Sequence, residues 1–187
     1  MPSGLDFNEE HTLRDGTRVV LRFIRHEDLA ALKDGFSHLS QVSRYHRFNG
    51  QVKELSNQML HFFVDVDGLD HVALVATTPP VNGISRGLAV ARFIRDPKEP
   101  SAAEFAITVT DEMQHKGLGG VIAVALAHAA SERGVRLFRG IMAYENTPIR
   151  RLLAELGPLT LETIGTECMF EVKLPAATAP ELQVASS

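Results

Sequence analysis

The chain has 187 residues, 44% of them hydrophobic and 22% charged, and its formal net charge is −4. These values are typical of one globular domain built around one core. The mildly acidic balance argues against a nucleic-acid partner, and no apolar run approaches the roughly 20 residues that span a bilayer.

The cysteine content and the first residues favour a cytoplasmic protein. Cys168 is the only cysteine, so an internal disulfide is excluded and a reducing compartment fits. The segment 1–11 is polar and lacks the apolar centre of a signal peptide. We expect Cys168, on an apolar strand, to lie in the core rather than to act as a nucleophile. No cysteine pair or histidine spacing suggests zinc, so no metal is expected.

The first half of the chain is expected to hold three strands and two helices. Apolar runs bounded by Gly, Pro and charged residues predict the strands, and apolar residues spaced three and four apart predict the helices. The region 40–50, rich in basic and aromatic residues, is expected to be irregular. The predicted strands are 17–24, 71–76 and 87–94, and the predicted helices are 27–36 and 54–64.

The second half alternates strands and helices more regularly, which predicts an α/β fold with a mixed sheet. The segment 175–187 is rich in Ala, Pro and Ser and is expected to be a disordered tail, which leaves a single domain at 1–174. The predicted elements are a strand at 103–110, a helix at 118–133, a strand at 137–143, a helix from Asn146 to Leu156 and a last strand at 166–174.

The most informative stretch is Gln114-His115-Lys116-Gly117-Leu118-Gly119-Gly120, which joins the strand 103–110 to the helix 118–133. The first N–H groups of a helix have no acceptor within it and mark the positive end of its dipole. Two of these glycines lack a β-carbon where a phosphate would approach the backbone, and the lysine adds positive charge. The stretch therefore predicts a pyrophosphate site. The alternative is a tight strand–helix turn that binds nothing.

The spacing Gln-x-x-Gly-x-Gly is neither that of a P-loop nor that of a Rossmann fingerprint. It resembles the coenzyme A pyrophosphate loop of the GNAT N-acetyltransferases. Three neighbouring features agree with this resemblance: Val109-Thr110-Asp111-Glu112 before the loop, Asn146 after the next strand, and Leu156-Gly157 at the end of the next helix. The resemblance is specific from Ile84 to Gly157 and looser over 19–27 and 40–48.

The resemblance implies a GNAT fold, in which about four helices flank a central, mostly antiparallel mixed sheet, and it implies acetyl-CoA as cofactor. Backbone N–H groups from Gln114 to Gly119 would hold the diphosphate. The pantetheine arm would pair like an extra strand with the backbone of Ile107 to Val109. The implied cofactor-binding residues are Ile107, Thr108, Val109, Gln114, His115, Lys116, Gly117, Leu118, Gly119, Gly120 and Asn146.

Glu104 is the candidate general base. It lies in a strand of mostly apolar residues, where a partly desolvated carboxylate would take up a proton more readily. The resemblance supports this role, because the family commonly places a glutamate base on this strand, and Ala-Glu-Phe-Ala resembles bacterial protein-lysine acetyltransferases. The alternative is an ion pair between Glu104 and Arg92 or Arg95 on the preceding strand.

Two positions concern the sulfur end of the cofactor. Asn146 would hydrogen-bond the pantetheine arm or a water, or it would cap the helix that begins beside Pro148. Many family members carry a tyrosine seven residues later as the acid that protonates the thiolate. This chain has Leu153 there. Tyr144 is near in sequence but not equivalent, so the sequence does not identify the acid, and water could serve in its place.

The implied activity is transfer of an acetyl group from acetyl-CoA to a primary amine by direct attack, preferably to a protein lysine. A small-molecule amine is the second acceptor, and a non-catalytic acyl-CoA-binding or sensor protein is the third reading, kept open by Leu153. The segment Ser43–Phe48 either lines the acceptor cleft or forms a solvated basic loop anchored by Phe48. A homodimer stays open.

Overall fold

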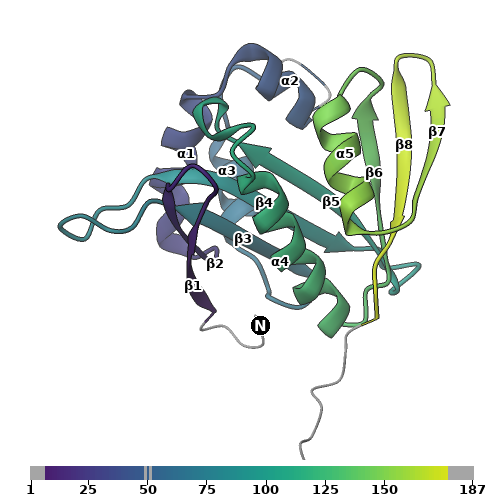
Figure 1. Cartoon of the computed structure of the whole chain (residues 1–187), viewed down its shortest axis with the longest axis horizontal. Coiled ribbons are helices and arrows are strands. Elements are labelled where there is room, and N and C mark those ends of the chain that lie inside the picture. The colour runs from purple at the N-terminus through teal and green to yellow at the C-terminus, as the bar shows by residue number, and fades with distance from the viewer. Residues whose placement is uncertain (1–6, 49, 51, 177–187) are drawn as a thin grey trace, which may run out of the picture.

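The computed structural model describes residues 7–48, 50 and 52–176. One eight-stranded sheet runs through the molecule in the order β1-β2-β3-β4-β5-β6-β8-β7 (Figure 1). Neighbouring strands are antiparallel except β5 and β6, which are parallel. The strands are β1 (Asn8–Thr12), β2 (Arg18–Phe23), β3 (His71–Thr77), β4 (Gly87–Arg95), β5 (Ala102–Val109), β6 (Leu137–Ala143), β7 (Leu159–Ile164) and β8 (Glu167–Lys173). The helices are α1 (Leu29–Ser37), α2 (Gln41–Phe48), α3 (Asn57–Val64), α4 (Leu118–Glu132) and α5 (Thr147–Leu156), with 3₁₀ turns at His26–Asp28 and Asp111–Met113.

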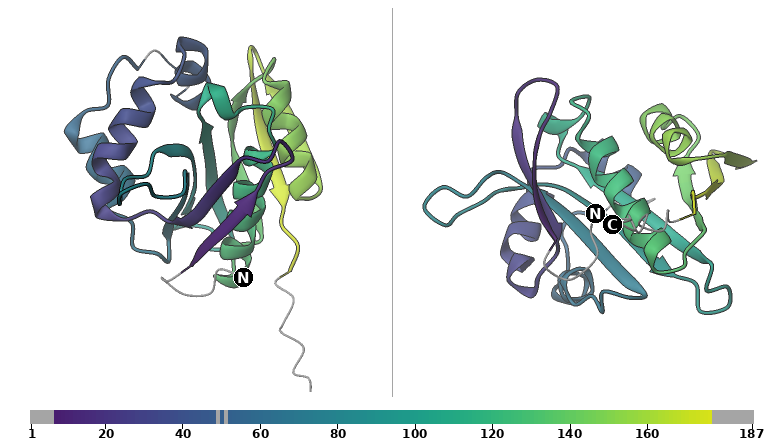
Figure 2. Two further views of the ribbon diagram at one scale, coloured as in Figure 1. Left: turned by 60° about the vertical axis from the view of Figure 1, so that its left-hand side comes forward. Right: turned by 60° about the horizontal axis from the view of Figure 1, so that its bottom comes forward.

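Helices cover both faces of the sheet. α4 and α5 pack side by side on one face, and α1 and α3 lie on the other (Figures 1 and 2). The main core forms under α4, where Phe93, Leu126 and Phe138 are fully buried. A smaller apolar cluster, which includes Val64 and Val75, fills the opposite face. Burial of apolar surface on both faces fixes the sheet between the two helical layers.

The sheet opens in its middle. β5 and β6 pair only from Ala102 to Glu104, opposite Leu137 to Arg139. β6 then remains paired with β8 as far as Ala143, so the two halves of the sheet separate beyond Glu104. Among the described residues, the backbone of β5 from Phe105 to Val109 therefore has no strand partner on the β6 side. An unpaired strand edge can pair with an extended ligand.

The predicted fold class is confirmed, with three local differences. The region 40–50, expected to be irregular, contains α2 instead. No residue of α2 is fully buried, so it lacks the apolar periodicity that would have revealed it. Its Arg44 is held by the main-chain oxygens of Ser37, Leu39 and Lys53. β1 and β7 were not predicted either, because both are edge strands composed mainly of exposed residues.

The predicted disordered tail, 175–187, lies largely outside the described residues, so the division at 174 remains a prediction. Pro175 is described, and its carbonyl accepts a hydrogen bond from Ser131 Oγ at 3.0 Å. Within the described ranges, no helix is long and apolar enough to cross a membrane.

Candidate active site

The turn between β5 and α4 has the backbone geometry of an anion site. His115 and Gly117 both have positive φ, at 61° and 88°, and α4 begins at Leu118. The first helical hydrogen bond runs from Val121 N to Gly117 O, at 3.2 Å. The amides of Leu118 to Gly120 therefore precede the hydrogen-bonded part of the helix and are available to an anion. A β-carbon on Gly117 would meet no atom of the described residues within 4 Å, so there is space beside it.

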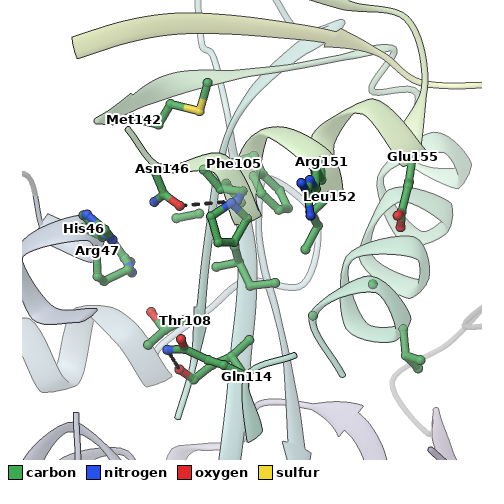
Figure 3. A pocket seen from close by; sticks show the side chains of 18 of the residues that line it. His46, Arg47, Phe105, Thr108, Gln114, Met142, Asn146, Arg151, Leu152 and Glu155 are labelled. Carbon is green, nitrogen blue, oxygen red and sulfur yellow. Dashed lines mark hydrogen bonds between the residues drawn. The ribbon is translucent and has the colours of Figure 1, made fainter. Parts of the chain in front are cut away.

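The side chains of the turn are largely committed to protein contacts. Gln114 Nε2 donates to Ser43 Oγ at 3.1 Å and to Val109 O at 3.3 Å. Figure 3 marks one hydrogen bond of the Gln114 amide with a dashed line. Lys116 forms an ion pair with Asp15 at 3.4 Å. Hydrogen bonds from the backbone and side chain of Thr17, with a smaller contribution from Lys116, lower the pKa of Asp15. Any anion here would thus be held mainly by the backbone, as the sequence predicts.

Asp111 joins this turn to α2. Its carboxylate accepts hydrogen bonds from Ser40 N at 2.7 Å, Ser40 Oγ at 3.0 Å and Ser43 Oγ at 2.6 Å. Burial works to raise the pKa of Asp111, but the hydrogen bonds from Ser43 and Ser40 outweigh it and hold the pKa below its ordinary value. The loop and the helix therefore form one hydrogen-bonded wall of the cleft.

A cleft of about 2260 Å³ occupies the opening between β5 and β6. It is large enough for an extended cofactor together with a second substrate. Among the predicted cofactor-binding residues, all line it except Leu118, which is fully buried beneath the turn. The lining set is Ile107, Thr108, Val109, Gln114, His115, Lys116, Gly117, Gly119, Gly120 and Asn146.

Asn146 lies across the cleft from the α4 turn, at the start of α5. Its Oδ1 accepts a hydrogen bond from Ile149 N at 3.3 Å, which makes it the helix cap (Figure 3). Its Nδ2 has no acceptor among the described residues. The capping role and a ligand-binding role are therefore compatible, because each uses a different atom of the side chain.

Glu104 lines the cleft at the point where β5 and β6 part. Its side chain is exposed, so the predicted desolvation is wrong: the residue faces the open cleft and not the core. The predicted ion pair is not formed either. Arg95 pairs with Asp70 at 2.6 Å, Arg92 donates to Phe63 O, and within the described ranges neither lies within 4.0 Å of the Glu104 carboxylate.

The position of the usual thiolate acid is closed to solvent. Leu153 is 0% exposed and belongs to the main core. Tyr144 does not line the cleft; its ring packs against the Arg150 guanidinium, 5.2 Å from ring centroid to Cζ, and is 53% exposed. Neither residue is thus placed to give a proton to a sulfur in the cleft. Cys168 is 1% exposed, as expected for a core residue.

Sequence reasoning missed two side-chain clusters. Outside the cleft, His26 and His61 both bond the Asp65 carboxylate, at 2.7 and 3.3 Å, and the three could hold a metal ion. All three are exposed, and the signal was weak because His26 comes from a distant part of the chain. The second cluster surrounds Arg47 and Arg92 beside Glu104. The sequence placed Arg47 in a segment, Ser43–Phe48, that could line the cleft, and Arg47 does line it, but no short motif connects it with Arg92.

Comparison with known proteins shows which family this chain resembles. Residues 83–163 match the model of FR47-like proteins. The chain is 30% identical over 146 residues to an acetyltransferase of Pseudomonas aeruginosa, covering 78% of this chain and 77% of that one. It is 29% identical over 164 residues to the acetyltransferase Pat of Mycolicibacterium smegmatis, covering 87% of this chain but only 48% of Pat.

The fold agrees with these matches. The crystal structure of the GNAT domain of S. lividans PAT superposes with a TM-score of 0.81 at 25% identity, over 92% of this chain and 99% of that domain. The split sheet with its amide-lined turn and these relatives together define an acyltransferase. The chain belongs to the GNAT family of acetyltransferases.

Proposed function

We propose that this acetyltransferase moves an acetyl group from acetyl-CoA to a primary amine, preferably that of a protein lysine. The observation that carries the proposal is the meeting of three elements in one cleft: the amide-lined turn before α4, the unpaired edge of β5, and the Glu104 carboxylate. The reaction requires that the diphosphate is bound, that the pantetheine arm is held and that the amine loses a proton. The turn, the edge of β5 and Glu104 provide suitable groups for these three tasks in that order.

The residues present fit coenzyme A. The amides from Gln114 to Gly119 would hold its diphosphate, and the β5 backbone from Ile107 to Val109 would pair with its pantetheine arm. Asn146 Nδ2, free of the capping bond, would donate to the arm or to an ordered water. The bound thioester supplies an acetyl group that an amine can attack.

Glu104 would act as the base on the amine. An ammonium ion must lose a proton before its nitrogen can form a bond to the acetyl carbon, and Glu104 lines the cleft where the thioester would lie. Formation of the C–N bond would break the C–S bond of the thioester and release the thiolate. We assign its protonation to water, because Leu153 is buried and Tyr144 lies outside the cleft.

The acceptor is the least constrained part of the proposal. A protein lysine is supported by the resemblance to bacterial protein-lysine acetyltransferases and by a cleft that is open and large. Buried Leu153 in place of the usual tyrosine favours one different function, a protein that binds acyl-CoA without turning it over.

Thiol release from acetyl-CoA with a panel of lysine peptides and small amines tests the proposal. Wild type should release thiol with at least one amine, and Glu104→Gln should keep its affinity for coenzyme A while losing roughly two to four orders of magnitude in turnover. Raising the pH should partly restore the variant, because more of the amine is then already deprotonated.

The pH–rate profile decides the role of Glu104. If wild type and Glu104→Gln share the same acidic limb, Glu104 is not the base. If coenzyme A binds but no amine on the panel releases thiol, the acyl-CoA-binding function replaces the enzymatic one.

A further inference from the structure

Two arginines on the α2 side of the cleft share one aromatic ring. The guanidinium of Arg92, on β4, lies 4.5 Å from the Phe63 ring centroid, and that of Arg47, on α2, lies 5.6 Å from it. Arg47 also packs over Phe48, at 4.9 Å. Both guanidiniums are thereby held against aromatic faces contributed by α2 and α3.

The inner arginine is buried and uses both of its terminal nitrogens in hydrogen bonds within the protein. Arg92 is only 4% exposed, and its Nη1 and Nη2 donate to Phe63 O at 3.3 and 3.2 Å. Its Nη1 also donates to His71 Nε2 at 3.1 Å. Burial, with the positive charge of Arg47 as the second cause, lowers the pKa of Arg92 to about 9. Arg92 thus adds positive charge to the site while having few donors left for a ligand.

In the part of the chain that the structure describes, the outer arginine contacts aromatic rings but no hydrogen-bond acceptor. Among the described residues, Arg47 makes no hydrogen bond and no ion pair, although burial lowers its pKa and only the charge of Glu104 opposes this. No Arg47 nitrogen is among the buried polar atoms of the described residues that lack a partner, so the guanidinium nitrogens reach solvent and their N–H groups can be donated to a ligand in the cleft. Arg47 lines the cleft, and Figure 3 shows it reaching in from α2, on the side away from Leu152 and Glu155.

The two arginines lie beside the proposed base. On β4, Arg92 is paired with Ala106 of β5, and Ile94 is paired with Glu104, so Arg92 and Glu104 point to the same face of the sheet. An amine that meets Glu104 would therefore have positive charge a short distance away on that face. A simple monoamine has no negatively charged group that could interact with the two arginines.

We propose that the acceptor carries a carboxylate a few carbon atoms away from its amine, or on the residue beside its lysine, and that Arg47 binds this carboxylate, with the charge of Arg92 behind it. The inference rests on the proposed amine acetylation and narrows its substrate class to amines with a neighbouring carboxylate. A carboxylate matches the planar fork of one guanidinium bidentately. A phosphate dianion fits less well, because the Glu104 charge repels it more strongly.

The carboxylate can come from an acidic residue beside a peptide lysine or from a free amino acid. Matched acceptor pairs separate these sources: a short peptide with Lys-Asp against the same peptide with Lys-Asn, and 4-aminobutyrate against its amide. We expect wild type to favour the carboxylate member of at least one pair by roughly tenfold to hundredfold in kcat/KM, the usual range for a charged hydrogen bond.

Variants at Arg47 assign the preference to that residue. Arg47→Met keeps the hydrocarbon packing on Phe48 and should lower the preference to about one, mainly through KM. Arg47→Lys keeps the charge without the fork and should retain part of it. Arg18→Gln is the matched control, because Arg18 is exposed on β2 and does not line the cleft, and it should leave the preference unchanged.

Equal rates within both pairs in wild type, or a preference that survives in Arg47→Met, would overturn the inference. Thermal unfolding checks each variant, and if Arg47→Met does not fold, the folded Arg47→Lys must show the reduced preference. Calorimetry with each pair at saturating coenzyme A needs no turnover. If no amine is acetylated, the proposed function fails, and the binding difference between pair members still decides the role of Arg47.

Discussion

The two ends of the cleft present different kinds of binding group: main-chain amides at one end and side chains at the other. At the α4 end the anion site consists of main-chain amides, and the side chains of Gln114 and Lys116 are turned to Ser43, Val109 and Asp15. At the other end, where the C-terminal part of α2 carries Arg47 to the cleft, the site consists of side chains. Arg47 from α2 and Glu104 from β5 line the cleft there, and successive contacts join Arg47 to Phe63 on α3, Arg92 on β4 and His71 on β3.

This difference has a consequence for function. A backbone site depends on a local fold, so it suits a cofactor fragment that every member of a family shares. A side-chain site changes with each substitution, so it suits the part of the reaction that varies, which is the acceptor. In one cleft, backbone groups would thus bind the cofactor that the family shares, and side chains would select the acceptor.

The largest expected effect lies at the backbone end. Gly117→Val should weaken coenzyme A binding by about a hundredfold or more, because φ of 88° is strained for a residue with a β-carbon and the amides would be turned away from the diphosphate. Calorimetry with coenzyme A measures the loss. Gly119 is a poorer choice, since its added β-carbon would come within 3.1 Å of Leu152 Cδ1 and disturb the packing of α4 on α5.

Gly83→Val is the matched control. Gly83, in the β3–β4 connection, has φ of 77° and nothing within 4 Å of an added β-carbon, as at Gly117. Both variants should lose a similar 1 to 2 kcal/mol or so of stability from backbone strain. Only Gly117→Val should lose the cofactor. Equal affinity in the two variants would place the diphosphate elsewhere.

The same difference explains how much could be read from the sequence. The Gln114–Gly120 turn is a continuous motif, so its position before α4 and its backbone character were predictable. Most of the strands and helices that carry it were predictable too, because their apolar patterns face a continuous core. The sequence did not predict β1 and β7, because edge strands bury few residues and so lack a clear apolar pattern. It did not predict α2, because no residue of that helix is fully buried.

The residues at the acceptor end of the cleft could not be predicted from the sequence in the same way. Arg92 is 21 residues from His71 and 29 from Phe63 in sequence, and only the pairing of β3 with β4 and the packing of α3 bring the three together. Glu104 was identified from its strand, but its exposure was predicted wrongly. An alternating strand pattern does not reveal that the neighbouring strand departs beyond that residue.

A smaller effect should appear as pH dependence at the side-chain end. Burial and then the charge of Arg92 lower the pKa of His71 from its ordinary value of 6.5. Below pH 6.5 the unfolded chain takes up a proton that the folded protein resists, so this contribution to stability is complete above 6.5 and is lost as pH falls through the folded pKa.

His71→Gln keeps an acceptor for Arg92 and removes the titration. Chemical denaturation from pH 7.5 to 5 should therefore show a steeper loss of unfolding free energy in wild type than in His71→Gln. All other titrating groups are common to both proteins, so the difference between the two curves isolates His71. Parallel curves would mean that the imidazole is not held neutral by its surroundings.

The smallest expected effect concerns the sulfur end, between the two sites. Tyr144→Phe should change turnover by less than about twofold, because the phenol lies outside the cleft against Arg150 and the thiolate is expected to take its proton from water. Steady-state kinetics with one good acceptor measures this. Loss of a general acid usually costs about a hundredfold or more. A fall of that size would mean that Tyr144 turns into the cleft when the cofactor binds. The Tyr144 hydroxyl would then protonate the thiolate, which the hydrocarbon side chain of Leu153 cannot do.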